Sequence, residues 1–95
     1  MPKENDRPQR SFEVLEWQIS QWQLEYAPDD SVEQFCQVSA EIGEVAKALK
    51  HDNVHHLSAS LGRSFIALMV LAQIEGLDPL TLLDDAWQSI NLTKL

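Results

Sequence analysis

Two glutamates stand three residues apart in the segment Glu41-Ile42-Gly43-Glu44. In a helix this spacing places both side chains on nearly the same side. Two carboxylates held in this way suit Mg²⁺ or Mn²⁺, because hard cations prefer oxygen ligands and keep coordination positions for phosphate oxygens. Acidic residues at this spacing are also common on solvated helix faces. Glu41 and Glu44 are therefore candidate metal ligands, and a solvated face is the alternative.

The next helical segment does not complete such a site. An acidic pair on a neighbouring helix would normally do so, but the chain has Ser60-Leu61-Gly62-Arg63 instead. A guanidinium at a ligand position repels Mg²⁺ by about 4 kcal/mol per unit of metal charge, at about 4 Å and an effective dielectric constant of about 20. Beside two carboxylates, the same group balances their charge through charge-assisted hydrogen bonds. We therefore expect Arg63 to bridge to Glu41 or Glu44, with an exposed and unpaired Arg63 as the alternative.

Two further residues belong to this pattern. Lys47 lies three residues beyond Glu44, on the rim of the same face, and is a candidate phosphate-binding residue or an ordinary solvent-facing lysine. His56 precedes Ser60 by one helical turn and is a candidate ligand for a softer metal such as Zn²⁺. The alternative for His56 is an ordinary surface histidine near a helix start.

Four helices are predicted to position these residues. The first covers Ser11 to about Tyr26 and is broken at Pro28, because proline disfavours helix in the residue before it. Asp30 or Ser31 caps the second helix. Its apolar residues repeat at spacings of three and four, which predicts a face that packs on other helices: Phe35, Val38, Ile42, Val45 and Leu49.

The third and fourth helices follow after short connections. Asn53 caps a helix from about Val54 to Glu75, which ends at Gly76, and Asp78-Pro79 begins the last one. From Phe65 to Ile74 the third helix is apolar almost all round, so we expect it to be buried on several sides and to contact another subunit. The pattern predicts an all-α fold, an antiparallel four-helix bundle that assembles as a homodimer or homotetramer through this third helix.

The composition limits the classes of function. A length of 95 residues suits one domain, with residues 1–10 as a mobile arm and 11–95 as the helical domain. The net charge is −8 and the basic residues are scattered, so we expect no nucleic-acid partner. The uninterrupted apolar run from Phe65 to Ala72 is shorter than the ~20 residues of a membrane span, so we expect no membrane partner. The single cysteine, Cys36, indicates a small core side chain in a cytoplasmic protein.

The segment from Ser39 to Leu49 resembles the signature helix of the MazG-like all-α nucleoside triphosphate pyrophosphohydrolases. The resemblance extends from about Leu15 to Asn91 and includes the Trp-rich first helix and the long third helix, which ends Leu71-Ala72-Gln73-Ile74-Glu75-Gly76. It implies the four-helix fold of that family. It also implies a Mg²⁺ site formed by Glu-Glu-x-x-Glu on the second helix and Glu-x-x-Asp on the third, which cleaves an NTP or dNTP to the monophosphate and pyrophosphate.

The chain departs from the family pattern at three of the five acidic positions. Ala40 stands at the first glutamate of the second-helix motif, and Ser60 and Arg63 stand at the third-helix acidic pair. The resemblance therefore implies a metal site reduced to Glu41 and Glu44, with Ser60 and Arg63 as replacements. In the same comparison, Lys47 is the residue placed to meet a triphosphate.

Three functions remain open. The preferred one is a relative that has lost hydrolysis and acts as a binding or interaction module, with a nucleotide as a possible ligand and no cofactor. The second is an active Mg²⁺-dependent pyrophosphohydrolase that uses Glu41 and Glu44. The third is a structural helical adaptor unrelated to nucleotides.

Overall fold

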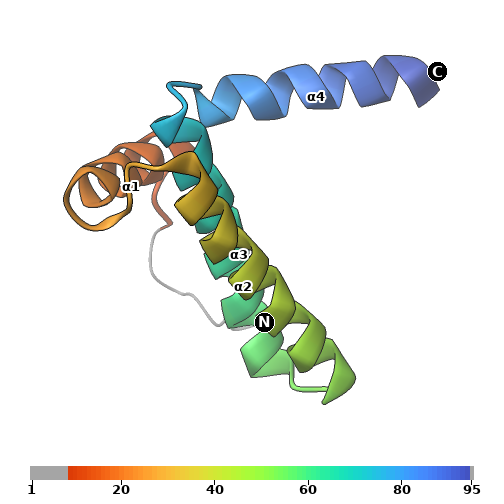
Figure 1. The fold of residues 1–95 in the computed structure, drawn as a ribbon. Coiled ribbons are helices and arrows are strands. Elements are labelled where there is room, and N and C mark those ends of the chain that lie inside the picture. Colours follow the sequence, from red (N-terminus) through yellow and green to blue (C-terminus); the bar gives the residue numbers. More distant parts are fainter. Residues whose placement is uncertain (1–8, 95) are drawn as a thin grey trace.

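All regular structure in the described part of the chain is helical. The computed structural model describes residues 9–94, with side chains as far as residue 92. The helices are α1 (Phe12–Tyr26), α2 (Ser31–Lys50), α3 (Val54–Ile74) and α4 (Pro79–Lys94) (Figure 1). No strand occurs among these residues, so the predicted all-α class with four helices is confirmed. The predicted arm lies outside the described residues except for Gln9 and Arg10.

The helix ends agree closely with the local sequence signals. The side chains of Ser11, Asp30 and Asn53 each accept a hydrogen bond from a backbone N–H two or three residues further on, as N-caps do. Gly76 has a φ of 75°, the left-handed conformation in which a glycine ends a helix without a steric penalty. Short-range chemistry therefore decides where each helix begins and ends.

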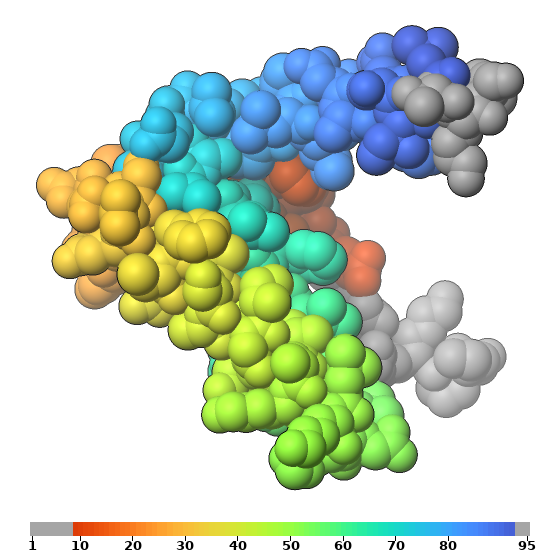
Figure 2. All heavy atoms as spheres, turned by 45° about the vertical axis from the view of Figure 1, so that its right-hand side comes forward, coloured from red at the N-terminus to blue at the C-terminus, as the bar shows by residue number. Residues whose placement is uncertain are grey.

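The helices α2 and α3 form an antiparallel hairpin that is the centre of the structure (Figure 1). Helix α1 packs on the C-terminal half of α3, where the side chain of Gln73 donates to the backbone oxygen of Glu16 at 3.3 Å. Helix α4 leaves the end of α3 and extends away from the hairpin, as the blue arm in Figure 2 shows. The single chain therefore supplies two closely packed antiparallel helices, and α4 does not pack along them.

The core of one chain is small. Its buried apolar residues include three alanines and two valines: Val38, Ala48, Ala67, Val70 and Ala72. Buried polar side chains add to the α2–α3 contact. The amide of Gln34, which is 4% exposed, donates a hydrogen bond to the backbone oxygen of Ala67 at 2.9 Å. Small side chains let the two helices approach closely but bury little apolar area.

The face of α2 that meets α3 differs from the predicted one. The buried positions on α2 are Gln34, Val38 and Ala48, while Phe35 and Leu49 are exposed. The contact therefore lies to one side of the most apolar row. Cys36, predicted to be a small core side chain, is also exposed. Apolar periodicity predicted which face of α2 is the most apolar. It did not predict which face of α2 packs against α3 within the chain.

Within a single chain, helix α3 is only partly buried. Phe65, Ile66 and Leu68 are exposed, and the predicted contact of this helix with another subunit stays a prediction. By length and composition alone, Val54–Ile74 could cross a membrane, with a mean hydropathy of 1.5 over its most apolar window and 28% of that window buried. A core helix of a water-soluble protein passes the same test, so this property alone does not distinguish the two environments.

Candidate functional site

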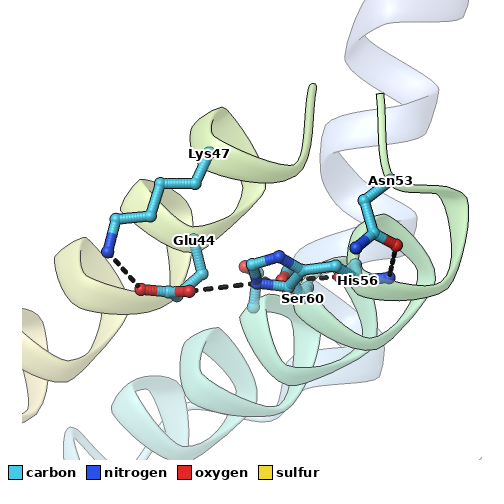
Figure 3. Close-up of polar contacts among 6 residues, drawn as sticks. Glu44, Lys47, Asn53, His56 and Ser60 are labelled. Carbon is cyan, nitrogen blue, oxygen red and sulfur yellow. Dashed lines mark hydrogen bonds and ion pairs between the residues drawn. The ribbon is translucent and has the colours of Figure 1, made fainter. Parts of the chain in front are cut away.

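The carboxylate of Glu44 is held between two basic side chains (Figure 3). Lys47, one turn further along α2, places its Nζ 3.2 Å from Oε2 of Glu44. His56, in the first turns of α3, donates from Nε2 to Oε1 of Glu44 at 3.0 Å. One contact is within α2 and the other joins α2 to α3. Both oxygens of the carboxylate are therefore engaged by protein groups.

These contacts lower the pKa of Glu44 below its usual value. The hydrogen bond and charge of Lys47 contribute most, and the hydrogen bond from His56 contributes next. Opposite charge and hydrogen bonds both favour the ionised form of a carboxyl. Glu44 is consequently a carboxylate at neutral pH, and nearby protein groups balance its charge.

His56 is held in position from its own helix. The side chain of Asn53 accepts a hydrogen bond from the backbone N–H of His56 at 3.0 Å and caps α3. Ser60, one turn later, donates from its hydroxyl to the backbone oxygen of His56 at 2.7 Å. Ser60 is fully buried. At a position where the family resemblance implies a carboxylate, this chain has a small neutral side chain that lets α2 and α3 pack together.

Glu41 and Arg63 lie on a separate feature, a cleft of about 420 Å³ between α1, α2 and α3. The rings of Trp22 and Tyr26 form one wall, with their centroids 5.9 Å apart. The amide side chain of Gln37 also lines the cleft, whereas Glu44 and Ser60 do not. The cleft thus combines an aromatic wall with one carboxylate and one guanidinium.

The expected bridge from Arg63 to a glutamate is not formed. Among the residues that the structure describes, the ion pairs are Lys47–Glu44 and His56–Glu44. Arg63 shares the cleft with Glu41 without pairing with it. The prediction of the bridge was wrong: Lys47 and His56 contact the two oxygens of Glu44, and Arg63 forms an ion pair with neither glutamate.

The structure therefore divides the predicted site residues into two groups. Glu44 and Lys47 are in direct contact, and Ser60 supports the helix turn that carries His56. Glu41 and Arg63 meet at the cleft. Within residues 9–94, no three His, Cys, Asp or Glu side chains gather closely enough to hold a metal ion.

Two residues that join α2 to α3 were missed or misjudged from the sequence. His56 was weighed as a metal ligand, and its contact with Glu44 was not foreseen, although its position one turn before Ser60 was the available signal. The buried amide of Gln34, which joins α2 to the backbone of Ala67, gave no signal, because glutamine at a helix start is usually solvated.

A second carboxyl pair lies where α1 approaches the start of α4. Interaction with Asp78 raises the pKa of Glu16, mainly through a hydrogen bond between the two carboxyls. The pKa of Asp78 is lowered, first by the hydroxyl of Thr81, which donates to it at 2.6 Å, and then by Glu16. Of the two carboxyls, Glu16 therefore keeps its proton to the higher pH, and Asp78 is the first to ionise.

Comparisons with known proteins add no relative to this description. No protein-family model, no curated protein and no solved structure matches the chain. The resemblance to the MazG-like family therefore rests on the sequence motifs alone.

Proposed function

We propose that this protein is a degenerate MazG-like protein that has lost Mg²⁺-dependent hydrolysis and acts as a binding module. The observation that carries the proposal is the state of Glu44. Its two carboxylate oxygens are 3.2 Å from Lys47 and 3.0 Å from His56. Protein groups thus occupy the positions from which a metal ion would be held.

The electrostatics of α3 support the same conclusion. A Mg²⁺ ion at Glu44 would have to displace Lys47 and His56, and α3 provides no carboxylate in return. Ser60 is neutral and buried, and Arg63 adds a fixed positive charge on the same helix. Since Mg²⁺ demands near-ideal octahedral geometry and loses its water reluctantly, one or two weakly placed carboxylates are a poor site for it.

The cleft beside Glu41 is the proposed binding site, with a nucleotide as its ligand. Trp22 and Tyr26 offer aromatic surface on which a base can stack. Arg63 has the planar guanidinium that binds phosphate oxygens with two hydrogen bonds, which would serve without a metal. Glu41 is an acceptor for the exocyclic amino group of a base.

A working Mg²⁺-dependent pyrophosphohydrolase remains the second candidate. The observation in its favour is that the Glu44 and Lys47 side chains are 40% and 66% exposed, so their ion pair can open to admit a ligand. In that case Glu41 and Glu44 would hold the ion and Lys47 would contact the triphosphate.

Two measurements distinguish these candidates. Isothermal titration should show nucleotide binding that persists in EDTA and weakens at least about 10-fold in Arg63→Ala, because one bidentate phosphate contact is lost. Lys50→Ala, which removes a lysine outside the cleft lining, is the matched control. Binding that requires Mg²⁺ and does not respond to Arg63→Ala would favour the second candidate, and no binding under either condition would refute both.

The second measurement is pyrophosphate release from a panel of NTPs and dNTPs with Mg²⁺ or Mn²⁺. The parent protein is expected to be inactive. The variant Ser60→Glu with Arg63→Asp, which rebuilds the acidic pair, is expected to gain turnover. Because Ser60 is buried, circular dichroism with and without Mg²⁺ must accompany the assay. Ser58→Glu, at an exposed position on the same helix, is the matched control.

A further inference from the structure

A second groove lies between α1 and the junction of α3 with α4. Its volume is about 550 Å³, and it shares no lining residue with the proposed nucleotide cleft. The α1 side of the groove includes Glu16, Trp17 and Leu24, and the opposite side includes Leu77 and Asp78. We call it the junction groove.

The apolar side chains of the junction groove are open to solvent. Trp17, Leu24 and Leu77 are 64%, 73% and 49% exposed. Since Trp17 and Leu24 are seven residues apart, they point in nearly the same direction from α1. No residue of α1 is buried. The groove therefore offers an aromatic and aliphatic surface that the described part of the chain leaves uncovered.

The charged side chains of the junction groove are acidic. The carboxyls of Glu16 and Asp78 are in contact, and the hydroxyl of Thr81 orients Asp78 by donating to it at 2.6 Å. Among the described residues no basic side chain lines the groove, and neither carboxyl takes part in an ion pair. Two carboxyls this close repel each other when both are ionised, and a cation beside them relieves the repulsion. A lysine or arginine side chain of a ligand would supply that cation.

We propose that the junction groove binds a basic amphipathic helix of another protein. A lysine or arginine of that helix lies against Glu16, and its apolar side chains cover Trp17 and Leu24, as amphipathic helices do in the grooves of their partners. The stretch of α1 that borders the groove, from Glu16 to Leu24, is about 12 Å long, which matches about two turns of a docked helix.

The charge of the chain favours this partner over a second copy. The chain carries a net charge of −8, and the charged residues of α1 are all acidic: Glu13, Glu16 and Glu25. Two copies paired through the junction groove would bring these carboxylates together. An anionic lipid surface would be repelled for the same reason, whereas a basic segment is attracted.

This binding site goes beyond the proposed nucleotide site and does not depend on it. The two sites have no lining residue in common. Failure of nucleotide binding would leave the junction groove available to a peptide, and failure of peptide binding would leave the nucleotide cleft as it is.

The test is the affinity of the full chain for a fluorescein-labelled basic peptide, measured by fluorescence anisotropy. The peptide has about 14 residues, or four helical turns, with leucines on one face and lysines on the other. The parent should bind it more tightly than a peptide with glutamate in place of lysine. Trp17→Ala should raise the dissociation constant at least about 10-fold, as loss of an aromatic anchor does. Glu16→Gln should raise it about 3-fold, because an exposed ion pair is lost.

The matched control is Asp52→Asn, which removes the same charge at the turn between α2 and α3, the end of the hairpin far from the groove (Figure 1). Asn tolerates the left-handed backbone of Asp52, which has a φ of 54°, so the control should fold and bind as the parent does. Leu24→Ala, at a position that is 73% exposed, is a second apolar variant and should also weaken binding. Circular dichroism checks the helix content of every variant.

Three results would overturn the proposal. The first is a parent that does not bind the basic peptide. The second is a dissociation constant that stays unchanged in Trp17→Ala and Leu24→Ala, or that rises equally in Glu16→Gln and Asp52→Asn. The third is a Trp17→Ala protein that loses mass in solution, or loses binding to lipid vesicles, while its affinity for the peptide is unchanged.

Discussion

At the scale of single residues, the central feature is a carboxylate whose charge is balanced by its own protein. Glu44 has Lys47 on one oxygen and His56 on the other, and its pKa is lowered as a result. Arg63, which the motif pattern placed opposite the glutamates, instead lies at a cleft with Glu41 and two aromatic rings. The Arg63 charge is therefore available to a ligand.

Lys47→Ala should raise the pKa of Glu44 toward its ordinary value, because Lys47 is the largest cause of the lowered pKa. His56→Ala should move the pKa in the same direction by a smaller amount. Carbon-detected NMR titration of the Glu44 carboxyl measures both shifts. Lys50→Ala is the matched control and should leave the titration unchanged. An unchanged Glu44 titration in Lys47→Ala would argue against the ion pair.

The same contacts set a pH dependence of stability. The folded-state pKa of Glu44 is lower than its unfolded value, so the stabilisation is fully present above the unfolded pKa of about 4.3. It is lost as the pH falls through the folded pKa. The difference in melting temperature between the parent and Lys47→Ala should therefore be largest near neutral pH and vanish in acid. A melting-temperature difference that grew in acid would contradict the lowered folded-state pKa of Glu44.

At the scale of helices, the α2–α3 hairpin is held by small side chains and by a buried amide. Gln34 is 4% exposed and donates to the backbone of Ala67 at 2.9 Å, so one side chain fixes the register of the two helices. Ser31 adds a second link at the same end of the hairpin through its hydroxyl, which donates to Glu75. The open end of the hairpin is thus joined by polar contacts.

Gln34→Ala should lower the free energy of unfolding by about 1–2 kcal/mol, because a buried hydrogen bond is lost and the carbonyl loses a partner. Gln37→Ala, an exposed glutamine one turn further on, should change it by less than about 0.5 kcal/mol. Urea unfolding of both variants at one protein concentration makes the comparison. Equal effects of the two substitutions would show that Gln34 does not join the helices.

The sequence predicted the helices well and their packing poorly. Helix ends depend on neighbouring residues such as Asp30, Asn53 and Gly76, whose capping chemistry is local and readable. The choice of buried face depends on partners elsewhere. Phe35 and Leu49 are more apolar than Gln34 and Ala48, yet the second pair faces α3.

The same limit applies to the candidate site. The sequence pattern singled out Glu41, Glu44, Lys47 and Arg63, and the structure places all four near α2–α3 contacts or the cleft. The sequence pattern could not show which basic side chain contacts which carboxylate. That pairing depends on the relative rotation and register of α2 and α3. A shift of one position along α3 decides whether His56 or another side chain reaches Glu44.

At the scale of the whole molecule, one chain leaves much of its apolar surface uncovered. Its buried apolar core includes only small residues, whereas large apolar side chains remain exposed on α2, α3 and α4. The extended shape, with a radius of gyration of 15.3 Å against about 12.4 Å for a compact domain of this length, agrees with that description.

The predicted homodimer implies a melting temperature that depends on protein concentration, because unfolding of such an assembly separates two chains. A rise of about 3–5 °C is expected for each tenfold increase in concentration, given the entropy of unfolding of two chains of this size. Differential scanning calorimetry over two decades of concentration measures it. A melting temperature independent of concentration would mean that one chain is stable alone.

The most direct test of the account is pyrophosphate release by the assembled protein with a panel of NTPs and dNTPs in Mg²⁺ or Mn²⁺. The central claim is that Lys47 and His56 have taken the place of a metal ion at Glu44 and that α3 supplies no carboxylate to complete a metal site. It predicts no release above the background by the parent protein, and release by the variant Ser60→Glu with Arg63→Asp. Metal-dependent turnover by the parent, abolished by Glu44→Gln, would contradict it.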